Sequence, residues 1–444
     1  MGRVILGFGL LAGGLLATGA ATAAGFKVNE QSAEVVGNAM AGDAARSESA
    51  SDLFFNPAAS GFMNRPQISV VGSGIFPHFH FQDGRATTAA GTPVPGINST
   101  DGKVDSFVPA LYGVLPLDLN LSAGLAITSP WGLSTNYRSD WIGRYYALNS
   151  KLRTVNITPS LAWRPLPNLS LGLGFQAQYA KADLSNAIDF GTLGAAARLP
   201  GALPGRQDGK ARVKGQDWGY GFTAGIQYHF SSATEIGLTY RSRIKHKLDG
   251  TARFELDSAG VGATLQGATG AFRKSDANAE LITPETISLA IQQRIGSAWT
   301  VMASATHTRW SRFDELRVRF DNPAQPDNVS VEDWNNATMY SLGVSYSPSP
   351  VWTWRAGIAF DESPVPTKTR TPRVPDSDRY WLALGASYQP TPQFALHAAY
   401  VHIWVEDADI RLLASDPGNA ARGSLFGHYE SRADVVALQA DWRF

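Results

Sequence analysis

The sequence has no cysteine, no excess charge of either sign and no catalytic signature. Without cysteine it holds neither a disulfide framework nor a thiolate metal site. Its 38 Lys and Arg residues balance 38 Asp and Glu residues, which gives no indication of a nucleic-acid partner. G-x-S-x-G, P-loop and dinucleotide-binding motifs are missing. His78 and His80 share a strand face, but no set of carboxylates accompanies them as a metal site requires. We therefore predict that the chain is not an enzyme and binds no cofactor or metal.

Only one long uncharged apolar run is present, from Val4 to Ala24. It follows Arg3 and ends at Ala21-Thr22-Ala23, an A-x-A pattern that predicts a signal peptide over residues 1–23. The alternative, a transmembrane helix, is disfavoured by the Gly and Ala content and by the lack of a following basic cluster. For an exported chain with no second apolar run, a closed barrel is the remaining way to span a membrane.

From Gln67 onward the connections between strand-like segments alternate between long and short. Fourteen segments are expected, at 67–82, 106–117, 119–128, 150–165, 168–185, 215–230, 233–249, 281–295, 298–320, 335–347, 351–362, 378–389, 393–410 and 431–444. The long connections are 83–105, 129–149, 186–214, 250–280, 321–334, 363–377 and 411–430. Outer-membrane barrels have short periplasmic turns and long outer loops, whereas a soluble sandwich has no reason to sort its loops in this way. We predict an all-β, fourteen-stranded antiparallel barrel over residues 66–444 in the outer membrane.

The faces of the segments agree with this assignment. In 218–230, Trp218, Tyr220 and Phe222 alternate with Gly219, Gly221 and other small or polar residues. Successive side chains of a strand point to opposite faces, so one face is apolar and the other small or polar. Lipid outside and a polar lumen inside produce that division. The slightly negative mean hydropathy of −0.14 is expected when only alternate residues face lipid.

About forty residues, 24–65, precede the first segment and contain few apolar anchors. A large barrel either keeps an open channel or is filled by a plug. We therefore expect residues 24–65 to form a plug, although a disordered tail of the same composition is the alternative.

Several motifs carry a resemblance to a known family. They are Ala24-Gly25-Phe26-Lys27-Val28-Asn29-Glu30, Asn56-Pro57-Ala58, Thr306–Phe313, Gly357–Pro366 and Pro375–Leu382. Together they make the chain similar to the long-chain fatty acid transporter family of outer membranes, from end to end of the mature sequence. The resemblance implies an amino-terminal hatch inside the barrel and uptake of hydrophobic molecules without an energy source. A hydrocarbon channel of the same family and a general diffusion porin are the alternatives.

The connection 129–149 is unusually aromatic for an outer loop, with Trp131, Leu133, Tyr137, Trp141, Ile142, Tyr145, Tyr146 and Leu148. Tyr137, Trp141 and Tyr145 are spaced four apart, as on one face of a helix. Such a surface indicates a capture groove for an apolar ligand, or alternatively loop packing or part of an aromatic girdle. Residues 187–203, with Ile188 and Phe190, are a candidate facing wall, or alternatively a helix that packs on its neighbours.

Ser129-Pro130 follows the third segment, and proline ends or distorts a strand. The resemblance implies that this strand bends inward beside the hatch and leaves a gap in the wall, whereas the residues alone also allow a simple strand end. Phe26, Asn56, Pro57 and Ala58 are the corresponding hatch residues.

Two further features concern the ligand and the membrane. The family places a basic head-group partner where this chain has Asn186, and Lys181 is a nearby substitute. A neutral residue there raises the prospect of a neutral hydrocarbon substrate. At the carboxyl terminus, Trp442 and Phe444 lie on the apolar face, the ending that barrel assembly machinery is expected to read. Outer-membrane lipid and lipopolysaccharide are the expected surroundings.

Overall fold

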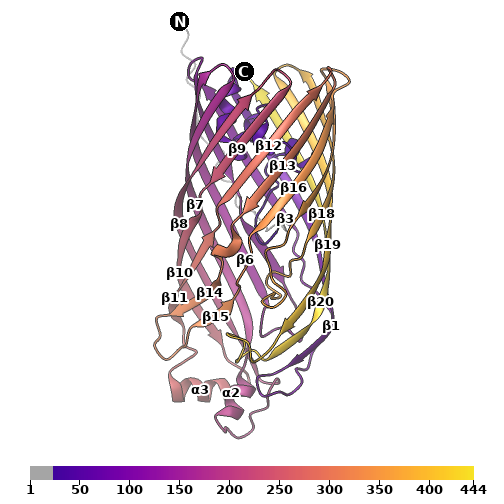
Figure 1. Cartoon of the computed structure of the whole chain (residues 1–444). Helices are drawn as coiled ribbons and strands as arrows, with labels where there is room; N and C mark the ends of the chain where they lie inside the picture. Colours follow the sequence, from indigo (N-terminus) through magenta and orange to yellow (C-terminus); the bar gives the residue numbers. More distant parts are fainter. Residues whose placement is uncertain (1–23) are drawn as a thin grey trace.

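The first and last strands of the sheet pair with each other, so the sheet closes into a barrel (Figure 1). The computed structural model describes residues 24–444; the predicted signal peptide, residues 1–23, lies outside this part. All strand pairs are antiparallel, and β20 pairs with β1 from Gln67↔Arg443 to Thr87↔Ser424. No helix within residues 24–444 is long and apolar enough to cross a membrane.

Fourteen barrel strands form the wall, as predicted, and five of them are divided into two segments by a local break. The undivided strands are β1 (Gln67–Thr87), β3 (Ser106–Pro116), β6 (Asn149–Leu166), β7 (Leu169–Asp189), β8 (Asp208–His229), β17 (Trp352–Asp361), β18 (Arg379–Thr391), β19 (Phe394–Leu412) and β20 (Ser424–Arg443). The divided strands are β4 (Leu121–Thr128) with β5 (Gly132–Asn136), β9 (Thr234–Arg241) with β10 (Ile244–Glu255), β11 (Ser275–Thr283) with β12 (Thr286–Ile295), β13 (Trp299–Thr308) with β14 (Glu315–Phe320), and β15 (Asn328–Val331) with β16 (Ala337–Tyr346). A short β2 (Thr100–Asp101) pairs with the outer part of β1.

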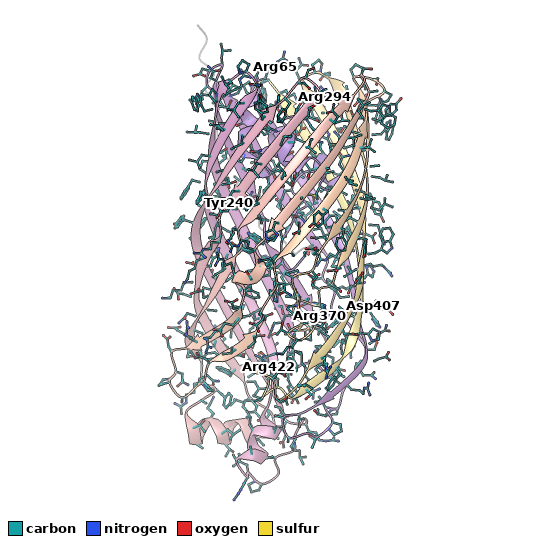
Figure 2. The ribbon with its side chains drawn as sticks, in the orientation of Figure 1. Arg65, Tyr240, Arg294, Arg370, Asp407 and Arg422 are labelled. Atoms are coloured by element: carbon teal, nitrogen blue, oxygen red, sulfur yellow. The ribbon has the colours of Figure 1, made fainter. Side chains whose placement is uncertain are left out.

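The short turns lie at the barrel end that carries the carboxyl terminus, and the long loops lie at the other end (Figure 1). The loop end also carries α2 (Phe190–Ala196) and α3 (Val261–Thr269). Arg65 and Arg294 mark the turn end and Arg422 the loop end (Figure 2). The predicted sorting of the loops is therefore confirmed, with the turn end periplasmic and the loop end outward.

Outward-facing positions carry the exposed aliphatic and aromatic side chains. On β8 these include Trp218, Tyr220 and Phe222, which are 47%, 63% and 46% exposed, while Gly219 between them is buried. Tyr240 projects from the outer wall in the same way (Figure 2). This is the predicted division into a lipid face and a lumen face.

The amino-terminal segment, residues 24–65, lies inside the periplasmic half of the barrel and is here called the hatch (Figure 1). It contains α1 (Ala33–Val36) and three 3₁₀ helices, η1 (Asp43–Ala45), η2 (Ala50–Phe54) and η3 (Pro57–Phe62). Asn56 caps η3, because its side chain accepts a hydrogen bond from Ala58 N at 2.9 Å, and Pro57 fixes the first turn. Ser49 and Asp52 form a capping box at η2.

Glycines on the lumen face let the hatch backbone approach the wall. A Cβ at Gly237 would collide with the backbone of Ala44, and one at Gly225 would collide with the Asn56 side chain. The small residues that alternate with aromatics in the sequence are therefore contact points for the hatch as well as lumen positions.

Several expected boundaries are corrected by the structure. The third strand resumes as β5 within the expected loop 129–149, so Trp131 and Leu133 lie in or beside the wall. The expected segment 298–320 is interrupted at 309–314, where the short η4 (Trp310–Arg312) turns into the lumen. β8 and β20 begin seven residues earlier than expected. The helical face suggested by the spacing of Tyr137, Trp141 and Tyr145 is not present. These residues lie in turns, held by hydrogen bonds from Arg144 to Pro95, Gly205 and Asp208.

Candidate functional site

The hatch is fixed to the wall by buried ion pairs. Glu34 of α1 lies 3.4 Å from Arg46 of the hatch, 3.0 Å from Arg355 of β17 and 3.5 Å from His397 of β19. Burial opposes ionisation of Glu34, but the charges of His397, Arg46 and Arg355 hold its pKa below the usual range. The carboxylate therefore stays charged, and it connects α1 to two strands of the wall.

Neutral hydrogen bonds extend this attachment around the barrel. Gln439 of β20 accepts from the Ser32 hydroxyl and from Ala33 N, both at 3.0 Å. On the opposite wall, Asn56 Nδ2 donates to Ala44 O at 2.7 Å and to Ile226 O of β8 at 3.1 Å. Buried backbone groups of the hatch are thus paired by side chains of the wall, which keeps this half of the lumen closed.

Glu34, His397 and Asp441 also place one ligand atom each within 4.8 Å of one another. Two guanidinium groups already contact or neighbour this cluster, so its negative charge is balanced by arginine. Ser387, His397 and Asp441 are hydrogen-bonded in series, but all three side chains are buried and Arg355 donates to the Ser387 hydroxyl. The series therefore lies among buried side chains, where His397 also lies 3.5 Å from Glu34 of the hatch.

The third strand breaks at Ser129–Trp131. The ladder between β4 and β6 ends at Thr128↔Asn156, and the ladder between β5 and β6 resumes at Gly132↔Arg153. Between them, Trp131 N and O bond the Thr154 hydroxyl, at 3.0 and 2.6 Å, instead of the backbone.

Hatch residues supply the hydrogen bonds that the broken strand lacks. Val28 N donates to Pro130 O at 2.9 Å, and Gly132 N donates to Phe26 O at 2.8 Å. The Gln31 side chain donates to Ser129 O at 2.9 Å. Residues 26–28 therefore act as a short strand beside the break, and Pro130, which has no N–H, accommodates the distortion.

On the other side of the break the wall is unpaired. The ladder between β3 and β4 ends at Leu111↔Ile127. The outer residues Ser106–Ala110 of β3 continue to pair with β1, and within residues 24–444 no ladder joins them to β5. Tyr112 OH donates to Gln31 O at 2.8 Å, so a hatch residue lies directly behind this gap.

An aromatic cluster lies between the hatch and the outer half of the lumen. Phe26 is at its centre, with ring centroids 5.9 Å from Trp131, 4.7 Å from Trp310, 5.5 Å from Phe313 and 5.6 Å from Trp334. We call these five residues the Phe26 cluster. Trp310 and Trp334 come from the breaks in the ninth and tenth strands, which explains why the chain leaves the wall there.

Gly25 allows the chain to enter this cluster. Its φ is +64°, and a Cβ there would lie 2.7 Å from Trp334 and 2.9 Å from Trp310. Only glycine accepts both the conformation and the space.

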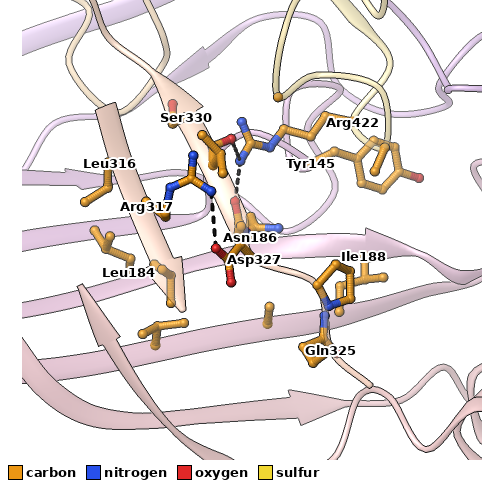
Figure 3. Close-up of a pocket in the computed structure, with 18 of the residues that line it drawn as sticks. Tyr145, Leu184, Asn186, Ile188, Leu316, Arg317, Gln325, Asp327, Ser330 and Arg422 are labelled. Atoms are coloured by element: carbon orange, nitrogen blue, oxygen red, sulfur yellow. Dashed lines mark hydrogen bonds and ion pairs between the residues drawn. The ribbon is translucent and has the colours of Figure 1, made fainter. Parts of the chain in front are cut away.

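A cavity of about 660 Å³, here called the outer cavity, occupies the loop-side half of the barrel (Figure 3). Its volume lies within the usual range of small-molecule sites. Most of its walls are apolar, and its apolar lining residues are Leu184, Ile188, Leu193, Val213, Phe254, Phe272, Leu316, Val318, Phe320, Val329 and Val331. Leu316 also packs against the Phe26 cluster, so the cavity extends toward the broken third strand.

Three arginines face the outer cavity in different charge environments. Arg317 is paired with Glu315 at 2.7 Å and Asp327 at 3.2 Å. Arg373 donates instead to Asn149 O, the Ser150 hydroxyl, Ser185 O and Asn186 Oδ1. Arg422 donates to Asn328 Oδ1 and to Val329 O, and no carboxylate of residues 24–444 lies within ion-pair distance of Arg373 or Arg422.

Burial and the neighbouring Arg422 lower the pKa of Arg373 to about 10, so it remains protonated at neutral pH. The cavity therefore combines apolar walls with two positive charges that make no direct ion pair within residues 24–444, while the buried Glu332 acts on both at longer range. That combination fits an apolar chain carrying an anionic group.

The aromatic residues of the outer loop pack mainly against one another. Tyr137 stacks on Trp141 with centroids 4.5 Å apart, and both contact residues of β1 or β20. Ile142, Tyr146 and Leu148 belong to the same buried cluster. Of this loop, Tyr145 also lines the outer cavity, where its hydroxyl donates to Asp208 at 2.7 Å.

Residues 187–203, the second apolar stretch, lie in two different environments. Ile188 lines the outer cavity. Phe190 is fully buried between α2 and α3 with Val261 and Leu265. Asp189 caps α2 by accepting from Thr192 N at 2.8 Å.

The two head-group candidates lie on different faces. Asn186 lines the outer cavity and contacts Arg373 at 3.5 Å. Lys181 lies on the outer, exposed face of β7, in line with Phe175 and Tyr179, and does not line the cavity. The alternation of β7 would have placed Lys181 outside the lumen from the sequence alone.

Arg373 and Arg422 were not foreseen from the sequence. Arg373 lies in the connection 362–378, which folds back into the lumen, where Tyr137 OH donates to Pro372 O at 2.7 Å. Only contacts between distant parts of the chain bring it beside Asn186. It places a basic charge beside Asn186.

Comparison with known proteins agrees with this architecture. The model of the family described as outer membrane protein transport protein (OMPP1/FadL/TodX) matches residues 14–444. The long-chain fatty acid transport protein of Escherichia coli O6:H1 is 31% identical over 401 residues, covering 86% of this chain and 87% of that protein. The putative outer membrane protein NMB0088 of Neisseria meningitidis serogroup B is 30% identical over 458 residues, 98% of each chain.

Solved structures give the same result. A Pseudomonas aeruginosa FadL homologue has a TM-score of 0.88 and 26% identity, and the match covers 95% of this chain and 100% of that one. The Ralstonia pickettii toluene transporter TbuX shares the fold, with a TM-score of 0.66, 17% identity, and coverage of 94% and 99%. The chain therefore belongs to the outer membrane protein transport family.

Proposed function

We propose that the protein is a passive uptake channel for long-chain fatty acids or similar carboxylate-bearing amphiphiles. The observation that carries the proposal is the outer cavity, in which Arg373 and Arg422 face apolar walls without a carboxylate partner. Arginine binds a carboxylate with two parallel hydrogen bonds, while the walls take the alkyl chain. The head group would lie near Asn186 and the chain would extend along Val213 and Phe254.

Capture would begin at the outer loops. Tyr145 and Ile188 line the cavity, so they are the members of the expected groove that contact the ligand in this proposal. Tyr137, Trp141, Ile142 and Tyr146 hold the loop in shape from behind. Phe190 positions α2 beside the cavity mouth.

Exit would be sideways, through the wall at the broken third strand. From the cavity, a ligand would pass Leu316 and the Phe26 cluster to reach Ser129 and Pro130. Displacement of residues 26–28 breaks two backbone hydrogen bonds and uncovers the gap between β3 and β5. The rest of the hatch, including Asn56, Pro57 and Ala58, stays attached to the wall and prevents leakage into the periplasm.

Two other functions are weighed against this one. A neutral hydrocarbon is the second candidate, because Asn186 is neutral and apolar residues dominate the cavity. A general diffusion porin fits poorly, because the buried hatch occupies the periplasmic half of the lumen. We also infer that the protein is not an enzyme, since all three side chains of the Ser387–His397–Asp441 series are buried.

The test compares binding of palmitate with binding of its neutral methyl ester by the purified protein. Each hydrogen bond to a charged group contributes about 1.5–3 kcal/mol, so Arg373→Gln with Arg422→Gln should weaken palmitate binding by roughly tenfold or more. Binding of the ester should change little. Arg317→Gln is the matched control, because Arg317 lines the same cavity but already has two carboxylate partners.

Equal binding of acid and ester by the unmodified protein would favour the neutral-hydrocarbon function. An equal loss for both ligands in the double variant would mean that the arginines only hold the cavity in shape.

A further inference from the structure

The outer face of the barrel carries a group of basic side chains just beyond its aromatic girdle. Tyr179 of β7 and Trp218 of β8 lie side by side at the girdle, with ring centroids 5.5 Å apart. Farther toward the loops, the outward positions on four neighbouring strands include Gln216, Asp183 and Asp249, but most are basic: Lys151 and Arg153 on β6, Lys181 on β7, Arg212 and Lys214 on β8, and Arg243, Lys245 and Lys247 on or beside β10. We call these eight basic residues the basic face.

The strand register brings like charges together on this face. Arg153 lies directly opposite Lys181, and Lys214 is the diagonal neighbour of Lys181 across β7 and β8. Opposed like charges on neighbouring strands destabilise a sheet unless an anion compensates them. On the same face, Asp183 lies directly opposite both Lys151 and Lys214, so part of this charge is compensated within the sheet.

Carboxylates of the chain neutralise only part of the basic face. Asp183 pairs with Arg212 at 2.7 Å and Lys214 at 3.5 Å, and Glu280 pairs with Lys245 at 2.7 Å. Within residues 24–444, Lys181, Arg243 and Lys247 make no ion pair with a carboxylate. Positive charge is left over at the level of lipid head groups.

The opposite wall differs at the same level. Beyond Trp404 of β19, the outward residues are mainly acidic and include Glu406, Asp407, Asp409 and Glu430. Asp407 projects from this wall, closer to the loop end than Tyr240 does on the other side (Figure 2). The basic face and this wall thus differ in charge at the same level.

We propose that the basic face binds the phosphorylated head group of an outer-leaflet glycolipid, the lipid A part of lipopolysaccharide. Phosphate oxygens accept charge-assisted hydrogen bonds from lysine and arginine. The acyl chains would lie along the lipid-facing Phe175, Tyr179 and Trp218 directly below. Aromatic residues at the interface below a basic cluster are the arrangement expected for an anionic lipid in a membrane. This binding is independent of the ligand that enters the outer cavity, because the side chains point away from the lumen.

The test measures binding of purified lipid A carrying both phosphates to the full protein in nanodiscs of phosphatidylcholine. Lys181→Gln with Lys214→Gln should weaken this binding by about tenfold or more. The matched control is Arg411→Gln with Arg432→Gln, which removes the same charge from the opposite wall and should leave affinity within about twofold. Heat-modifiable mobility on gels checks that each variant is a folded barrel.

Two further measurements distinguish the phosphate of lipid A from free inorganic phosphate. Enzymatically dephosphorylated lipid A should bind the unmodified protein as weakly as lipid A binds the Lys181→Gln, Lys214→Gln variant. Millimolar inorganic phosphate should not displace the lipid. Equal affinities of the two double variants for lipid A, or displacement by inorganic phosphate, would overturn the proposal.

Discussion

The periplasmic half of the lumen is filled by the hatch, which leaves a cavity of about 50 Å³ against the wall, whereas the outer half holds a cavity of about 660 Å³. The first half is held by buried ion pairs such as Glu34 with Arg355, at 3.0 Å. The second half has apolar walls and two arginines without a carboxylate partner. In the proposed function the outer half is the binding space and the hatch is the barrier, and the Phe26 cluster lies where they meet.

The two halves of the lumen differ in how their buried polar groups are hydrogen-bonded. At the junction of hatch and wall, Gln439 accepts from the hatch Ala33 N and Asn56 donates to the wall Ile226 O, so backbone groups on both sides are paired there. In the outer half, Arg373 and Arg422 donate to neutral oxygens and form no ion pair with a carboxylate of residues 24–444. A ligand should therefore reside in the outer half and meet resistance at the Phe26 cluster.

Removal of residues 26–55 should change the permeability of the barrel more than any substitution proposed below, because it empties the periplasmic half of the lumen. The barrel strands pair without the hatch, so the variant should insert and should conduct ions steadily in planar bilayers. The unmodified protein should stay closed under the same conditions. If the truncated barrel is equally impermeable, the hatch is not the barrier.

Substitution of Glu34 should loosen the hatch while leaving it in place. Glu34→Ala leaves Arg355 buried without an ion-pair partner, which costs about 3–5 kcal/mol. Glu48→Ala is the matched control, since the Glu48 side chain is 43% exposed and its pair with Arg46 contributes only about 0–1 kcal/mol. Glu34→Ala should unfold at a lower temperature and show more frequent brief conductance openings than Glu48→Ala. Identical behaviour of the two variants would show that Glu34 does not hold the hatch in place.

A smaller, pH-dependent effect is expected from Glu30. Burial raises the pKa of Glu30 to about 7, and hydrogen bonds from the backbone of residues 29 and 30 and the charge of Arg379 only partly oppose this rise. A carboxyl with a raised pKa is neutral in the docked hatch and ionises readily once exposed, so docking weakens as the pH rises from about 4.5 to 7. Brief openings should become more frequent as the pH rises from about 4.5 to about 7, and Glu30→Gln should remove that dependence. The same dependence in Glu30→Gln would assign it to another group.

Comparison with the sequence shows which features local patterns determine. The fourteen strands and the sorting of their loops follow from alternation, because each strand must present lipid and lumen faces. The breaks at 129–131 and 309–314 were only partly foreseen. Pro130 signalled the first, but nothing local indicates that Trp310 leaves the wall to pack on Phe26.

The candidate site was harder to predict for the same reason. Residues 362–378 enter the lumen through contacts with Tyr137 and Asn149, which are more than two hundred positions away in the chain. Arg373 therefore had no local signature. The four-residue spacing of Tyr137, Trp141 and Tyr145 suggested one face of a helix, but Arg144 holds these residues in turns through contacts with three separate loops or strands.

The most direct test of the account follows a ligand along its path. The ligand is a palmitate analogue that carries a photoreactive diazirine at the end of its chain. The protein is illuminated while it takes this analogue up into vesicles, and the labelled peptides are identified by mass spectrometry. The account predicts labels at Phe254 and Leu316 in the outer cavity, at Phe26 and Trp131, and on β3 near the lipid-facing Phe107. Labels within hatch residues 43–62, without labels on β3, would show that the ligand passes through the hatch and would contradict sideways exit.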